Sequence, residues 1–218
     1  MADITSCIEY SKETKASIKK KESSHFNHTN WGDDDLLEVR KEIRKFYRTK
    51  QKGICAFCKQ TVSLISASNC HIEHIVPKSL HLEYIFTPKN LCVICADCNQ
   101  IKRDQETLNE IPQTMNKSDS RKKYPKSGNG FYIVHPHFDN YDDHILIING
   151  YYIDKSSKKG NFTIGACNLN RKLAEFGWEP EFVNDSVIID EMNSFIDETD
   201  SLKRTNHLNN IRNQLFDV

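Results

Sequence analysis

The sequence predicts an α+β protein with a four-cysteine zinc site, flanking helices and a C-terminal extension that contains a small β segment. Two Cys-x-x-Cys pairs, at 55–58 and 95–98, predict the zinc site. Apolar residues at helical spacing predict helices on both sides of it. Short apolar runs on either side of an Asn-Gly pair at 149–150 predict a β-hairpin.

Bulk composition limits the classes of partner. The chain has 218 residues, and its 30 basic and 30 acidic residues give a formal net charge of zero. Proteins that bind nucleic acid unaided usually carry a basic excess, so neutrality favours a small basic patch or a partner that supplies most of the grip. No apolar run approaches a membrane span, and the N-terminus lacks a secretory signal. We therefore expect a cytoplasmic protein without a membrane partner, where paired cysteines more often bind metal than form disulfides.

Composition divides the chain into four regions. Residues 1–30 form a polar, lysine-rich arm, for which a solvated or partner-dependent tail is favoured over a basic arm lying on nucleic acid. Residues 31–110 carry the cysteine pairs and form the core. Residues 111–130 are a polar linker, and residues 131–218 form a C-terminal α/β extension that is expected to bind a partner. The length suits one domain with extensions or two small domains.

The first element is a helix that opens at Asp33-Asp34-Asp35, where carboxylates would cap free N–H groups. Its apolar face consists of Leu36, Val39, Ile43, Phe46 and Tyr47. Its other face is basic and consists of Arg40, Lys41, Arg44, Lys45 and Arg48. For this basic face, simple solvation is favoured over DNA binding. Gly53 ends the segment.

The later elements follow the same kind of pattern. Residues 131–134 read as a strand bounded by glycines, and residues 144–153 as the hairpin. A short helix begins near Asn168, and the tail from about Ser186 has helical spacing of its apolar residues.

The cysteine pairs are the strongest signal for a metal. Cys55 and Cys58 form the first pair, and the second is either Cys92/Cys95 or Cys95/Cys98. We prefer Cys95/Cys98, because the residues around Cys92 look like a strand, which places that thiol in the core. Four thiolates leave no position open for water, so the zinc would be structural. The doubled spacing disfavours the alternative of four free core cysteines.

Glu73 and His74 lie between the two pairs. Adjacent residues on a strand point to opposite faces, whereas His71 and Glu73 share a face. Pro77 ends any ladder soon afterwards. By spacing alone, a Glu-His dipeptide is more often an ordinary surface or core feature than a catalytic one.

The order of these residues changes that judgement. Cys-x-x-Cys, then Glu73-His-Ile-Val-Pro77, Asn90, and Cys-x-x-Cys-Asn-x-x-Lys102 resembles the HNH (ββα-metal) endonucleases with a zinc-knuckle frame. The resemblance covers about residues 53–104 and implies a ββα-metal core clamped by the zinc.

The resemblance also implies roles for individual residues. His74 is the general base, Glu73 and Asn99 hold a catalytic divalent ion, and Asn90 ties down a loop and orients the histidine. Lys102 and His71 are candidate contacts to the substrate phosphate; His71 is alternatively a third metal contact or simply structural. Glu73 stands where Asp is common in the family.

The chemistry of these side chains agrees with the implied roles. A histidine whose pKa is near neutral can take a proton from water. A hard ion such as Mg²⁺, or Mn²⁺ in its place, suits one carboxylate and one amide oxygen, and can polarise a phosphate and stabilise the leaving oxygen.

A narrower resemblance involves the form His71-Ile-Glu-His74-x-x-Pro-Lys and the later stretch 164–171, Ile-Gly-Ala-Cys-Asn-Leu-Asn-Arg. Together they look like the Septu- and retron-associated PtuB-type HNH nucleases, over about residues 30–180. That resemblance implies a DNA nuclease subunit in bacterial antiphage defence. Its partners would be an ABC-type ATPase, PtuA-like, and in some systems a retron reverse transcriptase. The arm and the C-terminal helices are candidate docking surfaces.

Two alternatives belong to other classes. The protein could be a stand-alone HNH endonuclease of restriction or homing type, although no sequence-reading domain is visible. It could also be a non-catalytic zinc-knuckle module that binds nucleic acid. The second alternative is disfavoured, because a binding module has no need of Glu73, His74, Asn90 and Asn99 in this order.

Overall fold

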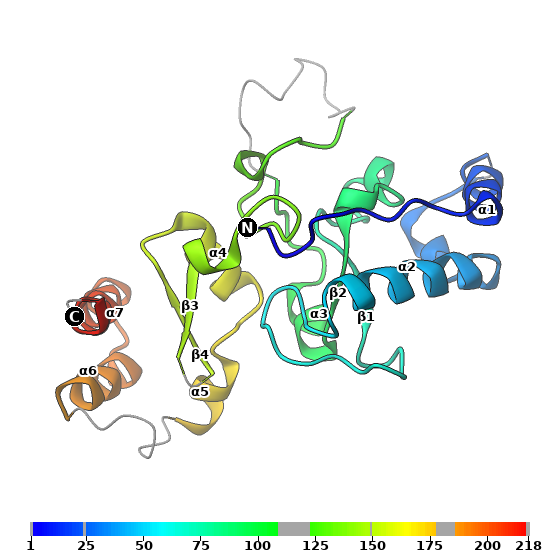
Figure 1. Ribbon diagram of the computed structural model, residues 1–218. Helices are drawn as coiled ribbons and strands as arrows, with labels where there is room; N and C mark the ends of the chain where they lie inside the picture. The colour runs from blue at the N-terminus through cyan, green and yellow to red at the C-terminus, as the bar shows by residue number, and fades with distance from the viewer. Residues whose placement is uncertain (1, 24, 109–122, 149, 178–185, 217–218) are drawn as a thin grey trace. The chain divides into compact units, whose positions relative to one another are not determined.

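The computed structural model describes residues 2–23, 25–108, 123–148, 150–177 and 186–216 (Figure 1). The chain forms two compact units, an N-terminal unit, Met1–Tyr141, and a C-terminal unit, Asp142–Val218. The composition placed the boundary between residues 130 and 131, whereas residues 131–141 pack within the N-terminal unit. Of the proposed linker, residues 111–130, the part from 111 to 122 lies outside the described residues.

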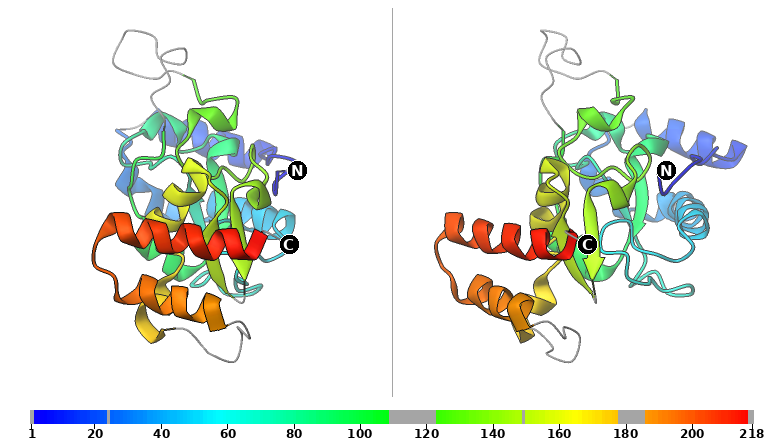
Figure 2. Two further views of the ribbon diagram at one scale, coloured as in Figure 1. Left: turned by 90° about the vertical axis from the view of Figure 1, so that its left-hand side faces the viewer. Right: turned by 60° about the vertical axis from the view of Figure 1, so that its left-hand side comes forward.

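The N-terminal unit is built around a two-stranded sheet and three helices (Figures 1 and 2). Its elements are α1 (Lys12–Glu22), α2 (Leu37–Lys50), β1 (His71–His74), β2 (Leu91–Ile94) and α3 (Ala96–Lys102). The strands are antiparallel, with His71 opposite Ile94 and His74 opposite Leu91. Helix α2 packs against both strands, and α3 packs against β1. This β1–β2–α3 arrangement confirms the ββα core that the sequence predicted.

Helix α2 buries the apolar face expected from its spacing. Leu36, Val39, Ile43 and Tyr47 are each at most 1% exposed. The start of the helix differs from the prediction, because neither the short 3₁₀ turn Asp34–Leu36 nor α2 has a side-chain cap. The carboxylates instead bind α1: Lys21 Nζ lies 2.7 Å from Asp33 and 2.9 Å from Asp35.

The N-terminal arm is not the solvated tail that its composition suggested. Ile4, Ile8 and Ile18 are buried, and the Tyr10 hydroxyl donates a 2.8 Å hydrogen bond to the Phe86 carbonyl. The apolar residues of the arm are too few to form a core of their own, but they are enough to cover a core that already exists. Lys12, Lys15, Lys19 and Lys20 of α1 are exposed, which explains why the composition resembled a tail.

The strand expected at 131–134 does not form. Within the described residues, Phe131 makes one isolated antiparallel bridge with Leu108, and the Tyr132 N–H donates to the Thr107 carbonyl at 2.8 Å. Ile133 and Val134 are consecutive and both buried. This apolar run therefore lies in the core of the N-terminal unit but outside its named strands.

The C-terminal unit contains the predicted hairpin and the predicted terminal helices. Its elements are β3 (Ile145–Ile148), β4 (Tyr151–Asp154), α4 (Lys158–Ala166), α5 (Arg171–Phe176), α6 (Ser186–Asp197) and α7 (Ser201–Phe216). Gly150 has a φ of 86° in the turn, while Asn149 lies outside the described residues. Helices α6 and α7 pack together, and their core consists of Ile153, Ile188, Met192 and Ile211.

The second sequence motif, Leu169-Asn170-Arg171, has a structural role in this unit. The Asn170 amide accepts a hydrogen bond from the Tyr152 N–H and donates one to the Tyr152 carbonyl, both at 2.8 Å. This pair of bonds ties the start of α5 to β4. In the described part of the chain, no helix has the length and apolar content needed to cross a bilayer.

Candidate active site

The four predicted cysteines form one buried cluster. The sulfurs of Cys55, Cys58, Cys95 and Cys98 all lie within 4.8 Å of one another, and the Cys58 and Cys95 sulfurs are 3.6 Å apart. A tetrahedral zinc with Zn–S bonds of about 2.3 Å separates its sulfurs by about 3.8 Å. The cluster therefore has the ligands and size of a zinc site, and it settles the second pair in favour of Cys95 and Cys98. Cys92 is buried in β2.

Backbone bonds hold the first knuckle against β2. The Ala56 N–H donates to the Val93 carbonyl at 3.1 Å. The Gln51 amide binds both backbone groups of Val93 at 2.8 Å. Because Cys98 lies in α3, the cluster fixes that helix relative to the β1–β2 strand pair. Asn99, the next residue, is thereby placed beside β1.

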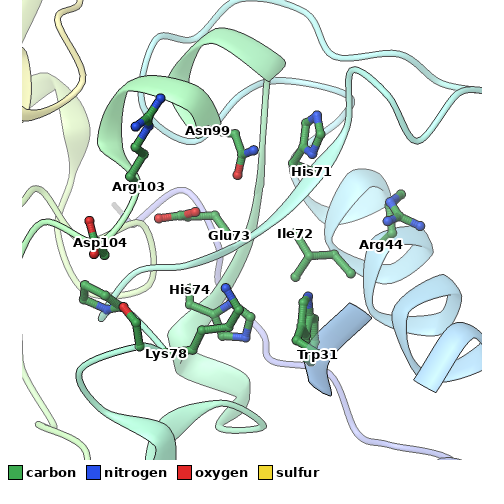
Figure 3. A pocket seen from close by; sticks show the side chains of 12 residues that line it. Trp31, Arg44, His71, Ile72, Glu73, His74, Lys78, Asn99, Arg103 and Asp104 are labelled. Carbon is green, nitrogen blue, oxygen red and sulfur yellow. The ribbon is translucent and has the colours of Figure 1, made fainter. Parts of the chain in front are cut away.

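A pocket of about 600 Å³ opens beside β1 and α3 (Figure 3). Its lining residues are Trp31, Arg44, His71, Ile72, Glu73, His74, Pro77, Lys78, Ser79, Asn99, Arg103 and Asp104. The structure thus brings together four of the predicted site residues, and it leaves Asn90 and Lys102 out of the lining. Glu73 and His74 were expected on opposite faces, but both border the pocket. Strand β1 ends at His74, so the alternation of a regular ladder ends there too.

His74 is buried and held in one tautomer. Its Nε2 lies 3.1 Å from the Ile85 carbonyl oxygen. A carbonyl can only accept, so Nε2 carries the proton and Nδ1 keeps a lone pair. The Trp31 ring packs edge-on, with centroids 4.6 Å apart. Burial, and then the positive charge of Lys78, lower the pKa of His74 to about 3, well below the near-neutral value expected from the sequence, so the ring is neutral at pH 7 but is a weaker base than expected.

Asn90 holds the loop that supplies the Ile85 carbonyl. The side chain is fully buried. Its oxygen accepts from the Val76 N–H at 2.7 Å and the Tyr124 hydroxyl at 3.1 Å. Its amide donates to the carbonyls of Val76 and Tyr84, each at 3.1 Å. Since Tyr84 precedes Ile85 directly, these bonds fix the carbonyl that orients the imidazole.

Glu73 lies beneath the pocket with a buried lysine as its counter-charge. Lys102 Nζ is 2.5 Å from Glu73 Oε1, and it also donates to the His74 carbonyl at 3.3 Å. The short contact is a buried ion pair, so Lys102 is the partner of Oε1. Burial raises the pKa of the Glu73 carboxyl, and the charge of Lys102 acts in the opposite direction.

This position of Lys102 is at odds with the phosphate contact suggested by the sequence. Its side chain is 0% exposed, and its ammonium group is directed at Glu73. The residue lies three positions after Asn99 on α3, which puts both on the side of the helix that packs on β1. Asn99 reaches the pocket there, whereas Lys102 lies beneath it.

The donors around Glu73 suit a hard divalent ion. The Glu73 carboxylate and the Asn99 amide border the same pocket (Figure 3), although Oε1 of Glu73 already has Lys102 Nζ beside it. Carboxylate and amide oxygens are ligands that Mg²⁺ and Mn²⁺ favour. His71 borders the same pocket, where its Nε2 donates to the Ser68 carbonyl at 2.8 Å.

Sequence reasoning missed several residues of the pocket. Lys78 and Arg103 flank the motif and bring positive charge to the pocket. Arg44 was assigned to a solvated helix face, although its spacing from the apolar residues of α2 left both orientations open. Trp31 carried no sequence signal, because its packing on His74 depends on the fold of the arm.

The cysteine order, the β1–β2–α3 geometry and the pocket can now be compared with known families. Residues 55–105 match the family model of the HNH endonucleases. This HNH segment contains both knuckles, the Glu73–His74 strand and α3. It covers less than half of the chain. HNH nucleases use divalent metals, which agrees with the oxygen donors of the pocket. No curated protein matches the chain.

Proposed function

We propose that the protein is a metal-dependent HNH endonuclease that hydrolyses phosphodiester bonds of DNA. The observation that carries the proposal is the pocket itself, where neutral His74 lies beside Glu73 and Asn99. A binding module would not need a buried, neutral histidine with one fixed tautomer at the edge of such a pocket. The HNH match over residues 55–105 supports the same reaction class.

His74 acts as the general base in this proposal. Its Nδ1 accepts a proton from the attacking water, because Nε2 is already occupied by the Ile85 carbonyl. Asn90 acts as a positioning residue, since it holds the loop that carries that carbonyl. The positive charges of Arg44, Lys78 and Arg103 attract the phosphate to the pocket.

Glu73 and Asn99 hold the catalytic Mg²⁺ or Mn²⁺. When bound, the ion supplies positive charge that polarises the phosphate and stabilises the leaving oxygen. The four cysteines hold a separate zinc that takes no part in the reaction, because four thiolates leave no position for substrate.

A plasmid-nicking assay tests the proposal. Supercoiled DNA is incubated with the wild-type protein and Mg²⁺ or Mn²⁺, and the relaxed product is quantified over time. His74→Ala should lower the rate by about 100-fold or more, the usual range for loss of a general base. His25→Ala is the matched control, since His25 is exposed and outside the pocket.

Equal nicking by wild type and His74→Ala would contradict the assignment of the base. Thermal unfolding of both variants shows whether a loss of activity reflects a loss of fold. Metal analysis of the purified protein checks the zinc, and a preparation that is folded without zinc would contradict the structural role of the cysteines.

We further propose that this nuclease is a subunit of an antiphage defence complex, with an ABC-type ATPase and in some systems a retron reverse transcriptase. The resemblance of its two motifs to PtuB-type nucleases and its zero net charge support this proposal. Nicking should change by about tenfold or more when a cognate PtuA-like ATPase is added. Full activity of the lone protein, unchanged by the ATPase, would instead favour a stand-alone restriction or homing enzyme.

A further inference from the structure

Helix α2 carries two kinds of basic residue on two different sides. Arg40, Arg44 and Arg48 recur every four positions and are all partly buried, whereas Lys41 and Lys45 are exposed. Residues four apart lie on one side of a helix, about 6 Å apart along its axis. The three arginines therefore form a stripe of about 12 Å, here called the arginine stripe.

The arginine stripe follows the edge of the pocket. Arg40 Nη1 donates to the Trp31 carbonyl, and Arg44 Nε to the Cys70 carbonyl at 2.8 Å. Both Trp31 and Arg44 line the pocket, and Figure 3 shows them on the same side of it, opposite Asp104. Arg48 continues the stripe beyond the pocket, beside the loop that precedes β1.

Of the three arginines, Arg40 has a carboxylate nearby, because its charge helps to lower the pKa of Asp33. In the described ranges, none of the three guanidinium groups forms an ion pair, and each binds backbone carbonyls instead. Burial lowers the pKa of Arg44, and the charges of Arg40 and Arg48 lower it further. These neighbouring like charges remain together in the fold although they repel one another. A guanidinium has five N–H donors, so a carbonyl contact leaves most of them available.

We propose that the arginine stripe binds backbone phosphates of the DNA duplex whose scissile bond enters the pocket. Arginine is suited to this role, because its planar fork of donors matches the oxygens of a phosphate. The inference rests on the proposed nuclease function and adds a binding surface to it. It also explains how a protein with zero net charge can hold DNA, since the local charge beside the pocket is what the duplex meets.

The salt dependence of DNA binding tests the arginine stripe. Fluorescence anisotropy of a short labelled duplex is measured at several salt concentrations, in a His74→Ala background that prevents cleavage. The slope of log affinity against log salt is negative, and each lost phosphate contact reduces its magnitude by about 0.9. Arg44→Gln/Arg48→Gln should therefore reduce the magnitude of the slope by about 1.8 and weaken binding at every salt concentration.

The same helix offers a matched control. Lys41→Gln/Lys45→Gln removes the same net charge from the exposed side, and should leave the slope unchanged. Arg44→Lys/Arg48→Lys keeps the charge and should recover most of the slope. Thermal unfolding of each variant separates loss of fold from loss of binding.

Two results would overturn the proposal: a wild-type slope in the arginine-to-glutamine variant, or no duplex binding by the parent protein. In the first case the stripe would be free to meet an acidic protein surface instead. Plasmid nicking by the His74-containing protein separates the two inferences. Nicking together with arginine-independent binding would contradict phosphate binding by the stripe but support the nuclease function. Arginine-dependent binding without nicking would support phosphate binding by the stripe but contradict the nuclease function.

Discussion

The cysteine cluster and the pocket share helix α3 but differ in what the chain provides. Cys98 belongs to the cluster and Asn99 to the pocket. The cluster presents four buried sulfurs within 4.8 Å of one another, a complete set of ligands. The pocket presents two carboxylates, Glu73 and Asp104, and one amide, Asn99, around a volume of about 600 Å³. The cysteine cluster is thus a complete set of metal ligands, whereas the pocket has space for a further molecule.

The two sites also differ in how their charge is compensated. A set of thiolates needs a cation, because like charges repel strongly in a buried cluster. Glu73 already has a cation in Lys102, 2.5 Å away. We therefore expect the cluster to depend on its metal for folding and the pocket to be preformed without one.

The largest expected effect is the loss of the zinc. Cys95→Ser, or a strong chelator, should unfold the N-terminal unit, because a structural zinc contributes on the order of 10 kcal/mol of folding free energy. Circular dichroism during thermal unfolding measures the loss. Cys92→Ser is the control, since that thiol is buried in β2 outside the cluster. Equal destabilisation by the two serines would contradict the zinc site.

The second effect follows from removing Lys102, the cation that compensates the charge of Glu73. Lys102→Met should destabilise the protein by about 3–5 kcal/mol, because it leaves Glu73 buried without a counter-charge. Urea unfolding measures the change. Added Mg²⁺ should restore part of the stability of this variant and have little effect on the wild type. The double variant Lys102→Met/Glu73→Gln should recover most of it, and failure of both rescues would contradict the role of the ion pair.

The third effect distinguishes Asn90, which stabilises the loop beside the pocket, from Asn99, which borders the pocket itself. Asn90→Ala should cost about 1–3 kcal/mol, since it leaves buried groups without their partners. It should also slow nicking. Asn99→Ala, on the pocket surface, should change stability by less than about 0.5 kcal/mol and still abolish most nicking. If the two variants lost stability equally, Asn90 would have no special part in the loop.

The last effect concerns the β1–β2 pair that both sites share, and it shows only as a dependence of stability on pH. His137 Nε2 donates to the Leu91 carbonyl at 2.8 Å, and burial lowers the pKa of His137 to about 4. Its unfolded value is near 6.5, so between these values the unfolded chain binds the extra proton. Stability from this group is complete above pH 6.5 and falls toward pH 4, by at most about 1.4 kcal/mol per pH unit.

Chemical unfolding at several pH values measures this dependence. His137→Gln keeps a donor for the Leu91 carbonyl but cannot titrate, so its stability should vary less with pH over that window. Identical curves for the variant and the wild type would show that His137 is not buried in its neutral form.

The sequence predicted the parts of the fold that depend on local spacing. The doubled Cys-x-x-Cys pattern identified the cluster, and the apolar period of α2 identified the face that carries Ile43 and Tyr47. The order Glu73, His74, Asn99 indicated the residues that the pocket brings together. Each Cys-x-x-Cys pair and the apolar period of α2 are short-range signals, whereas the association of Glu73 with Asn99 was indicated by the order of motifs along the chain.

Features that depend on distant packing were not predictable in this way. Lys102 looked like a surface residue, because a lysine is rarely fully buried, and only the position of Glu73 on β1 explains it. The arm looked like a tail, because its isoleucines find a core that other segments provide. The run 131–134 resembled a strand because it is apolar and bounded by glycines, but among the described residues it forms only the isolated bridge between Phe131 and Leu108.

For the proposed nuclease, the buried lysine would set an order of assembly for the two metals. Because Lys102 neutralises Glu73 in the folded protein, the N-terminal unit can mature before any catalytic ion arrives. Zinc supply would then control how much folded protein accumulates. Magnesium supply and the arrival of DNA would control only when it acts, so the amount of enzyme and the timing of cleavage answer to different metals.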